Sequence, residues 1–314
     1  MINRHAVIDL GTNTFQFCVA EIEGNNFQII FEKSLAPKLG KGGISNGIIT
    51  TEAIERAIVA LMEFKNIAKS YEIDVSSVYA FGTSAIRNAK NGVEFCEIIH
   101  EKIGLKIQII DGEKEAELIA SGVRKAVQFN QDPFLIMDIG GGSVEFIIAS
   151  ESTIYWKQSF EIGAQRLIDL FFDTDPIAPT QIKRMYDYFD EKLIQLSNAI
   201  HQYLPKTLVG SAGSFETLAD IYHFSQNPKT EYIQPISSQI PIESFYDSYF
   251  KFLEFDRDKR LAIPGMISLR VDMIVVASVL IDYIIKTFKI EEIKISTFAL
   301  KEGVLAKLAK NEPL

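Results

Sequence analysis

Two stretches of the chain repeat one pattern of hydrophobic and polar residues. In each, an apolar segment ends in Asp-x-Gly-x-x-Thr/Ser and is followed by a second apolar segment, a short polar turn and a third apolar segment. The copies span residues 5–34 and 133–160. Short apolar runs bounded by turn residues predict β-strands, so each copy is expected to form three consecutive strands. The matching aspartates, Asp9 and Asp138, are separated by about the length of one domain.

The residues that follow each triple of strands repeat as well. Apolar residues at helical spacing predict a helix over 51–71, beginning at Thr50 or Thr51, and another over 180–203. A short strand that ends in small residues comes next, and then a strand and helix pair. Both halves therefore predict the order βββαβαβα, which implies a mixed sheet with helices on its faces. The second half carries extra helical material, at about 222–286.

Composition indicates a globular protein of two domains. The chain has 314 residues, of which 47% are hydrophobic and 23% charged. Its longest apolar run, residues 273–281, is bounded by aspartates and is far shorter than the about 20 residues that cross a membrane, so it predicts a buried helix. Cys18 and Cys96 have no CxxC partner, which favours reduced thiols. With no signal-peptide pattern at the first residues, we expect a cytoplasmic protein.

The charge balance excludes a simple basic binder of nucleic acid. Asp and Glu number 41 against 32 Lys and Arg, which gives a formal net charge of −9. Such a chain does not attract a phosphate backbone through its overall field. A phosphate-rich ligand would have to be held by local cations such as Arg87, Lys38 and Lys41. We therefore expect no nucleic-acid partner and no membrane partner.

The repeated Asp-x-Gly-x-x-Thr/Ser turn has the chemistry of a phosphate-binding loop. Its glycines let backbone N–H groups approach phosphate oxygens, its hydroxyls add donors, and an aspartate at a strand end can hold Mg²⁺ through water. A glycine-rich hairpin used only for its geometry is the alternative. Two copies in register favour phosphate binding, since two facing loops suit a chain of phosphates. The expected phosphate-binding residues are Gly11, Thr12, Asn13 and Thr14 in the first copy and Gly140, Gly141, Gly142 and Ser143 in the second.

Longer motifs resemble those of a known family. The segments AVIDLGTNTFQF, FGTSAIRNAKNG, IIDGEKEAELIASGV, MDIGGGSVEFII and VGSAGSFETLA occur in the order of the exopolyphosphatase and guanosine pentaphosphate phosphohydrolase (Ppx/GppA) family, within a resemblance that runs from residue 6 to 305. DIGGGSxE combined with TSAxRxAxNG is specific to this family, whereas DxGTN is shared across the actin, sugar kinase and Hsp70 superfamily. The resemblance implies an α/β protein of two duplicated actin-like, ribonuclease H-like domains with a cleft between them, in the short form that lacks further helical domains.

The resemblance also implies roles for single residues. It places the catalytic base on Glu115 and a phosphate-holding arginine on Arg87. Glu145, which alternates onto the face of Ser143, is a candidate for binding metal or positioning water. Each residue also has a purely structural alternative. Glu115 could be a first-turn glutamate that interacts favourably with the helix dipole, Arg87 a surface arginine and Glu145 a solvated strand glutamate. The expected metal ligands are Asp138, Glu145 and Asp9 with Mg²⁺ as the metal, and Gly210, Ser211 and Gly213 could form a third donor loop.

The chain departs from the family pattern at four positions. It has Glu117, Lys38 and Lys301 where the family usually has arginine, and Thr297 where it usually has aspartate. Glu117 would put a negative charge near the expected base. We expect these departures to bear on the affinity for a polyanion.

Together these features predict two domains and three candidate functions. Residues 1–124 are expected to form the first domain, with the C-terminal helix of 299–314 packed back onto it, and residues 125–298 the second. The first candidate is an exopolyphosphatase that depends on Mg²⁺ and releases phosphate from the ends of inorganic polyphosphate. The second is a phosphohydrolase acting on guanosine pentaphosphate. The third is a regulatory module that binds polyphosphate or nucleotide without turnover. A homodimer is one possible assembly.

Overall fold

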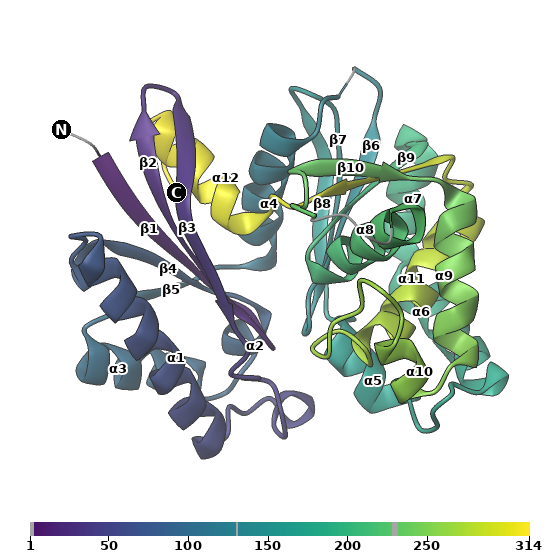
Figure 1. The fold of residues 1–314 in the computed structure, drawn as a ribbon, viewed down its shortest axis with the longest axis horizontal. Coiled ribbons are helices and arrows are strands. Elements are labelled where there is room, and N and C mark those ends of the chain that lie inside the picture. The colour runs from purple at the N-terminus through teal and green to yellow at the C-terminus, as the bar shows by residue number, and fades with distance from the viewer. Residues whose placement is uncertain (1–2, 130, 228–231) are drawn as a thin grey trace. The chain divides into compact units, whose positions relative to one another are not determined.

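Each copy of the repeated pattern forms three antiparallel strands of a mixed sheet. The computed structural model describes residues 3–129, 131–227 and 232–314. The chain divides into two compact units, Met1–Lys125 with Leu300–Leu314 and Ala126–Ala299. Figure 1 shows the elements of each unit.

The first unit has a sheet of five strands in the order β3-β2-β1-β4-β5. β1 pairs antiparallel with β2, and β2 with β3, whereas β4 and β5 run parallel to β1. The strands are β1 (Asn3–Leu10), β2 (Phe15–Glu23), β3 (Asn26–Leu35), β4 (Val78–Gly82) and β5 (Ile107–Ile109). The sheet therefore joins a predicted meander to two strands that each follow a helix.

Helices cover both faces of this sheet. Along β1, Ala6, Ile8 and Leu10 point into the core formed with α1 and α3, because side chains alternate between the faces of a strand. The C-terminal helix α12 contacts β1, β2 and β3 and lies beside the N-terminal strands in Figure 1. The helices of this unit are η1 (Ile44–Asn46), α1 (Thr51–Ser70), η2 (Val75–Ser77), α2 (Ser84–Arg87), α3 (Gly92–Ile103), α4 (Gly112–Ala126) and α12 (Leu300–Ala309). Thr50 caps α1 as expected, since its hydroxyl accepts a hydrogen bond from the Ala53 N–H.

The second unit repeats the sheet with one additional edge strand. Its order is β10-β11-β9-β6-β7-β8, so β8, β7, β6, β9 and β11 take the places of β3, β2, β1, β4 and β5. The strands are β6 (Phe134–Ile139), β7 (Val144–Ala149), β8 (Ile154–Phe160), β9 (Thr207–Ser211), β10 (Ser237–Ile240) and β11 (Glu292–Ser296). The common order confirms the duplicated actin-like α/β fold that the sequence predicted.

One face of the second sheet carries a large hydrophobic core. Leu135, Met137 and Ile139 of β6 point into it together with residues of the surrounding helices. The apolar run at 273–281 lies in the buried helix α11, as predicted. The helices are α5 (Ala164–Phe171), α6 (Pro179–Lys192), α7 (Ile194–Tyr203), α8 (Gly213–Gln226), α9 (Ile242–Glu254), α10 (Arg257–Leu261) and α11 (Met273–Phe288).

Two expectations differ from the structure in detail. The helix expected over 180–203 is two helices, because the chain leaves helical geometry at Leu193, which ends α6 and begins α7. The material at 222–286, expected to be helical, includes strand β10, which pairs antiparallel with β11. β10 is polar along most of its length, so its sequence pattern does not predict a strand.

Other predictions concern cysteine chemistry and membranes. Cys18 and Cys96 form no disulfide, and burial raises the pKa of the Cys18 thiol to about 12 and that of Cys96 to about 11, so both stay protonated at neutral pH. Within the described ranges, no helix has the length and the hydropathy needed to span a bilayer.

Candidate functional site

The glycine loop of the second unit is held by the first turn of helix α5. The carbonyl oxygens of Gly140 and Gly141 accept hydrogen bonds from the N–H groups of Ala164 and Gln165, both at 2.9 Å. The Gly142 carbonyl accepts one from the Gly163 N–H at 3.2 Å. All three carbonyls of the loop therefore point toward α5.

The opposite side of the same peptide units consists of N–H groups. In a trans peptide the C=O of one residue and the N–H of the next point in opposite directions. The N–H groups of Gly141, Gly142 and Ser143 therefore point away from α5. Successive N–H groups on one side of a turn form a concave site for an anion. The loop thus has the backbone geometry that phosphate binding requires.

Close packing requires glycine where α5 meets the loop. A Cβ on Gly163 would lie 2.5 Å from the carbonyl carbon of Gly141, the carbonyl carbon of Gly142 and the amide nitrogen of Ser143. Real Cβ atoms do not approach backbone atoms so closely. Gly163 therefore allows α5 to hold the loop from behind.

Two buried carboxylates lie on neighbouring strands beside the loop. Asp138 at the end of β6 is directly opposite Glu145 on β7, so both side chains lie on the same face, opposite the hydrophobic core. The Ser211 hydroxyl donates to Asp138 Oδ2 at 2.6 Å, and the Ser159 hydroxyl donates to Glu145 Oε1 at 2.6 Å. Asp138 is 7% exposed and Glu145 only 1%. These hydroxyl groups fix the orientation of both carboxylates.

Arg270 was not identified from the sequence but belongs to this group. Its guanidinium lies against the backbone at Gly213, where a Cβ would be 2.1 Å from its Nη2. Burial lowers the pKa of Arg270, and the negative charges of Glu216 and Asp138 act in the opposite direction. An arginine before an apolar helix is ordinarily a surface residue. Here the glycine at position 213 leaves room for the Arg270 guanidinium beside the site.

The first unit holds its loop in a similar way with a different segment. The N–H of Gly40 donates to the Thr12 carbonyl at 2.8 Å and the N–H of Lys38 to the Asn13 carbonyl at 3.0 Å. The N–H groups of Asn13 and Thr14 therefore point away from residues 38–40. A Cβ on Gly40 would lie 2.5 Å from Thr12 Cγ2, so glycine is required for this approach.

The turns themselves match in the two units. The Gly11 N–H donates to the Thr14 carbonyl at 3.2 Å, and the Gly140 N–H donates to the Ser143 carbonyl at 3.1 Å. Asp9 precedes the first turn on β1 as Asp138 precedes the second on β6. The structure thus places all eight expected phosphate-binding residues on two equivalent turns, one in each unit.

The expected base and the expected arginine contact each other in the first unit. Arg87 Nη1 lies 2.6 Å from Glu115 Oε2 and donates to the Ile110 carbonyl at 3.3 Å. The side chains are only 16% and 9% exposed. Arg87 ends α2 and Glu115 lies in the first turn of α4, so two separate segments bring the pair together. The guanidinium can both orient the carboxylate and offer further donors to an anion.

The residues expected to form a third donor loop do not share one environment. Gly210 lies within β9, where a Cβ would be 2.0 Å from the ring of Phe215, so its glycine is explained by packing. Ser211 donates its hydroxyl to Asp138. Gly213 begins α8 and faces Arg270. Ser211 therefore orients one carboxylate of the site, and phosphate binding by these three residues stays a prediction.

Two of the departures from the family pattern carry charges that are balanced locally. Glu117 accepts hydrogen bonds from Lys114 and from Lys307 of α12. Lys301 is buried and donates to Glu302 at 2.7 Å. Burial disfavours the charged form of Lys301, but nearby carboxylates outweigh it and raise its pKa. The negative charge of Glu117 is therefore compensated within its own unit.

The other two departures lie in backbone-bonded positions. The Thr297 N–H and hydroxyl both donate to the Ile236 carbonyl, at 3.0 and 3.1 Å. Lys38 supplies the N–H that holds the Asn13 carbonyl. The backbone contribution of Lys38 to the loop is independent of its side chain.

The carboxylates suit a magnesium ion that is shared with a substrate. Among the residues that the structure describes, no three His, Cys, Asp or Glu side chains gather to form a metal site of their own. Mg²⁺ commonly keeps several waters and is bound by one or two carboxylates together with substrate phosphates. Asp138 and Glu145, adjacent on one face, fit that donor set. Asp9 belongs to the other unit.

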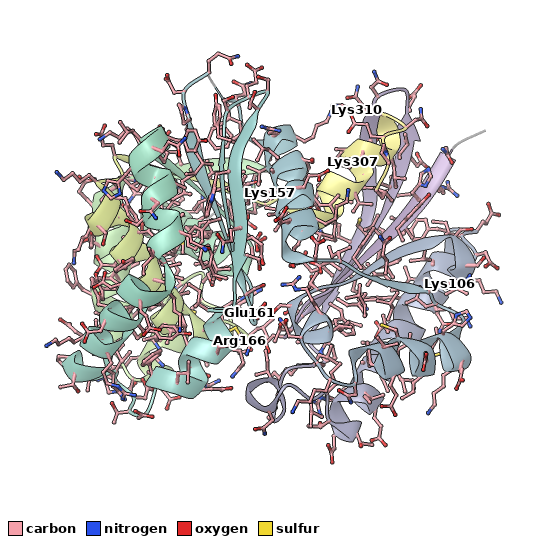
Figure 2. The ribbon with its side chains drawn as sticks, turned by 180° about the vertical axis from the view of Figure 1, so that it is seen from behind. Lys106, Lys157, Glu161, Arg166, Lys307 and Lys310 are labelled. Atoms are coloured by element: carbon pink, nitrogen blue, oxygen red, sulfur yellow. The ribbon has the colours of Figure 1, made fainter. Side chains whose placement is uncertain are left out.

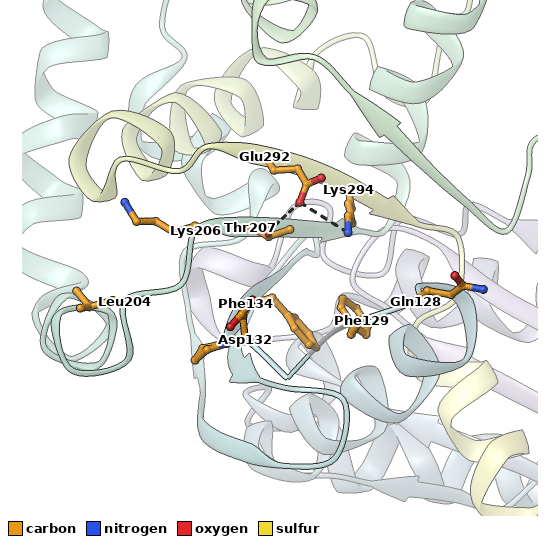
Figure 3. Close-up of a pocket in the computed structure, with 10 residues that line it drawn as sticks. Gln128, Phe129, Asp132, Phe134, Leu204, Lys206, Thr207, Glu292 and Lys294 are labelled. Carbon is orange, nitrogen blue, oxygen red and sulfur yellow. Dashed lines mark hydrogen bonds and ion pairs between the residues drawn. The ribbon is translucent and has the colours of Figure 1, made fainter.

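A separate pocket lies at the other end of the second sheet. It has a volume of about 570 Å³ and lies at the beginnings of β6, β9 and β11. Phe129 and Phe134 stack on its wall (Figure 3). On its wall, Glu292 accepts a hydrogen bond from Thr207 at 2.9 Å and lies 3.7 Å from Lys294. The parallel strands separate this pocket from Asp138 at the end of β6.

Comparison with known proteins adds relatives that cover the whole chain. Residues 18–312 match the model of the Ppx/GppA phosphatase family. A putative exopolyphosphatase of Haemophilus influenzae is 28% identical, over 98% of this chain and 91% of that protein. The crystal structure of an exopolyphosphatase from Cytophaga hutchinsonii superimposes with a TM-score of 0.94 at 40% identity, over 99% of both chains. The Aquifex aeolicus Ppx/GppA family member gives a TM-score of 0.80 at 25% identity, over 100% of both chains.

Proposed function

Because the chain belongs to the Ppx/GppA phosphatase family, we propose that it hydrolyses the terminal phosphoanhydride bond of inorganic polyphosphate and releases phosphate. The chain is a phosphoanhydride hydrolase of this family. The choice of polyphosphate as substrate is supported by relatives named as exopolyphosphatases, which match nearly the full length of the chain.

The observation that carries the proposal is the direction in which the loop N–H groups point. In each unit the loop carbonyls are held by a neighbouring segment, which turns the N–H groups of Gly141 to Ser143 and of Asn13 and Thr14 to the other side. Donors fixed before substrate arrives stabilise developing charge without reorganising during the reaction. Phosphoryl transfer depends mainly on such positioning and electrostatic stabilisation.

We assign the activation of water to Glu115. Its carboxylate would accept a proton from a water molecule while that water attacks the terminal phosphorus in line. The P–O bond to the leaving phosphate breaks, which releases orthophosphate and a chain shorter by one unit. The guanidinium of Arg87 holds the Glu115 carboxylate in place at 2.6 Å and adds positive charge where phosphate oxygens would lie.

We assign a magnesium ion to Asp138 and Glu145, which lie side by side on one face of the second sheet. Bound there, Mg²⁺ would neutralise negative charge on the phosphate oxygens. Ser211 and Ser159 hold these two carboxylates in fixed orientations. Arg270 supplies a further positive charge beside Asp138.

A phosphate-release assay tests the proposal. The purified protein is incubated with polyphosphate of defined length and, separately, with guanosine pentaphosphate, each with and without Mg²⁺. We expect Mg²⁺-dependent release from polyphosphate at the higher kcat/KM. Faster release from guanosine pentaphosphate would identify that compound, and not polyphosphate, as the preferred substrate. Release from neither would overturn the proposed activity in favour of binding without turnover.

Metal titration tests the assigned ligands. Asp138→Asn should raise the Mg²⁺ concentration needed for half-maximal activity, because it replaces an anionic oxygen with a neutral one. Asp247→Asn, an exposed aspartate on α9, is the matched control. A titration curve identical to the wild-type curve would remove Asp138 from the metal site.

A further inference from the structure

The side chain of Arg166 holds the phosphate loop of the second unit at one defined atom. Its Nε donates to the Gly142 carbonyl oxygen at 2.8 Å, and its Nη2 donates to Glu161 Oε2 at 2.9 Å. Figure 2 shows Arg166 and Glu161 next to each other at the end of the sheet. Arg166 lies in the first turn of α5, and its side chain is 19% exposed, against 42% for Glu161.

The Gly142 carbonyl determines the direction of one important donor. This carbonyl and the Ser143 N–H belong to the same peptide unit, so fixing one fixes the other. The Gly163 N–H also bonds this carbonyl, but at 3.2 Å. The shorter contact from Arg166 is a hydrogen bond from a charged donor, which is about twice as strong as a neutral one. Because glycine loops are conformationally permissive, that bond restricts the loop strongly.

The direction of the contact distinguishes two possible roles for Arg166. A guanidinium that bound phosphate directly would have to lie on the N–H side of the loop. The Arg166 guanidinium bonds the carbonyl side, and one of its remaining nitrogens pairs with a carboxylate that would repel phosphate. The geometry thus favours a role behind the loop.

We propose that Arg166 is a positioning residue: it fixes the Gly142–Ser143 peptide unit from behind, with Glu161 holding the guanidinium, and it does not contact phosphate. The inference rests on the proposed function, since it assigns the loop to phosphate binding. It assigns Arg166 a role that the sequence pattern did not indicate.

The first unit has a similar support one segment further from the loop. Arg56 on α1 donates from Nε to the Pro37 carbonyl at 2.6 Å and from Nη2 to the Lys38 carbonyl at 3.0 Å. The segment that it holds supplies the N–H groups that bond the Thr12 and Asn13 carbonyls. Arg56 is thereby assigned the same role, acting through residues 37–40.

Kinetics of three variants test the role of Arg166. Arg166→Met removes both hydrogen bonds, and we expect kcat to fall by about 10 to 100-fold, since small misplacement of catalytic groups has effects of that size. KM and its salt dependence should change by less than about twofold, because no phosphate contact is lost. Arg166→Lys should recover part of kcat. Arg184→Met is the control, because Arg184 also pairs with an acid but is 56% exposed and far from the loop in sequence.

Glu161→Gln separates the two roles most sharply. If Glu161 holds Arg166 in place, removing its charge should lower kcat several-fold. If Arg166 binds phosphate directly, removing the competing carboxylate should instead lower KM, and Arg166→Met should raise KM and flatten its salt dependence. Either of these KM results, or wild-type kcat in Arg166→Met, would overturn the proposal.

Hydrogen exchange gives a second measurement that is independent of activity. Peptides covering residues 140–147 should exchange faster in Arg166→Met than in wild type or Arg184→Met, at unchanged melting temperature. Unchanged exchange would contradict the positioning role even if the protein were inactive toward polyphosphate. Conversely, faster exchange in a protein without phosphatase activity would leave the support in place and reject only the proposed function. If Arg166→Met fails to fold, Glu161→Gln and Arg166→Lys are measured in the same way.

Arg56→Met is tested in parallel. We expect a fall in kcat of about the same size and faster exchange in residues 10–16. A variant with wild-type kcat and exchange would restrict the positioning role to Arg166.

Discussion

At the scale of single residues, the pairing of Arg87 with Glu115 determines how the carboxylate can act. Arg87 Nη1 lies 2.6 Å from Glu115 Oε2, so the guanidinium fixes the orientation of the carboxylate from which water would be activated. The pair also lies between two helices whose positions follow from separate strands, β4 and β5. Its geometry is therefore set by the sheet.

The first prediction concerns Glu115. Glu115→Gln should lower kcat by about 10² or more while polyphosphate binding is retained, because the amide still accepts a hydrogen bond but cannot take up a proton. Initial rates of phosphate release and the Kd of the variant check this. Glu113→Gln, an exposed neighbour in the same helix turn, should leave kcat near the wild-type value. Near-normal turnover in Glu115→Gln would transfer the role of base to Glu145.

The residues that the sequence revealed differ from those that it did not. Glu115, Arg87 and both loops lie within segments where several small and polar residues follow one another, which is uncommon outside functional turns. Arg270 and Arg166 contact the site through contacts between segments far apart or through a single backbone carbonyl. Such contacts depend on packing between segments, so the sequence did not indicate which atoms these two arginines hold.

At the scale of elements, the start of α8 is fitted around Arg270. Gly213→Ala should therefore lower phosphatase activity by about tenfold, because the new Cβ would lie 2.1 Å from Nη2 and the guanidinium must move. The melting temperature should change little, since alanine favours helix formation. If displacement of Arg270 is the cause, the double variant with Arg270→Ala should be no less active than Arg270→Ala alone. Additive losses would contradict this explanation.

Helix α8 also carries a carboxyl group whose ionisation opposes folding. Burial raises the pKa of Asp220 to about 6, above its ordinary value of 3.8. The folded state then binds more protons than the unfolded state between these values, so this group makes stability fall as pH rises from about 4 to 6. Asp220→Asn should raise the melting temperature at pH 8 and leave it almost unchanged near pH 4. Asp247→Asn on α9 is the control. Equal shifts of the melting temperature at both pH values would show that ionisation of Asp220 does not affect the stability of the fold.

Element order was predictable because the chain contains the pattern twice. The strand order of the two sheets confirms it, and among the strands of the described residues only β10 has no counterpart in the first unit. The break at Leu193 was not predictable, because apolar residues keep helical spacing on both sides of it. Periodicity records which face is buried and not where the helix axis changes direction.

At the scale of the whole molecule, the net charge of −9 opposes the approach of polyphosphate. Salt screens this repulsion and the local attraction alike, over a Debye length of about 10 Å at 0.1 M. The salt dependence of kcat/KM should therefore be shallower than for an enzyme with an extended basic groove. Measurements of kcat/KM from about 0.05 M to about 0.5 M salt check this, because the Debye length shortens severalfold over that range. A steep decrease would indicate a cationic track that the charge balance does not suggest.

Because the net charge opposes binding of polyphosphate, we also expect modest affinity, which predicts how products accumulate. Early in the reaction, gels should show a ladder of intermediate chain lengths, because the substrate is released between cleavages. Disappearance of full-length chains without intermediates would show a processive enzyme and contradict this view of the charge pattern.

The first unit is built from both ends of the chain. Its sheet carries α12, and a Cβ on Gly303 would lie 1.8 Å from the Leu118 carbonyl, so the last helix packs tightly against α4. During synthesis on a ribosome, the whole second unit is made before α12. Until then, the face of β1, β2 and β3 that contacts α12 is uncovered. Since domains generally fold as units, the first unit emerges first and finishes last. The face of its sheet that contacts α12 therefore stays uncovered for at least the time needed to synthesise the second unit.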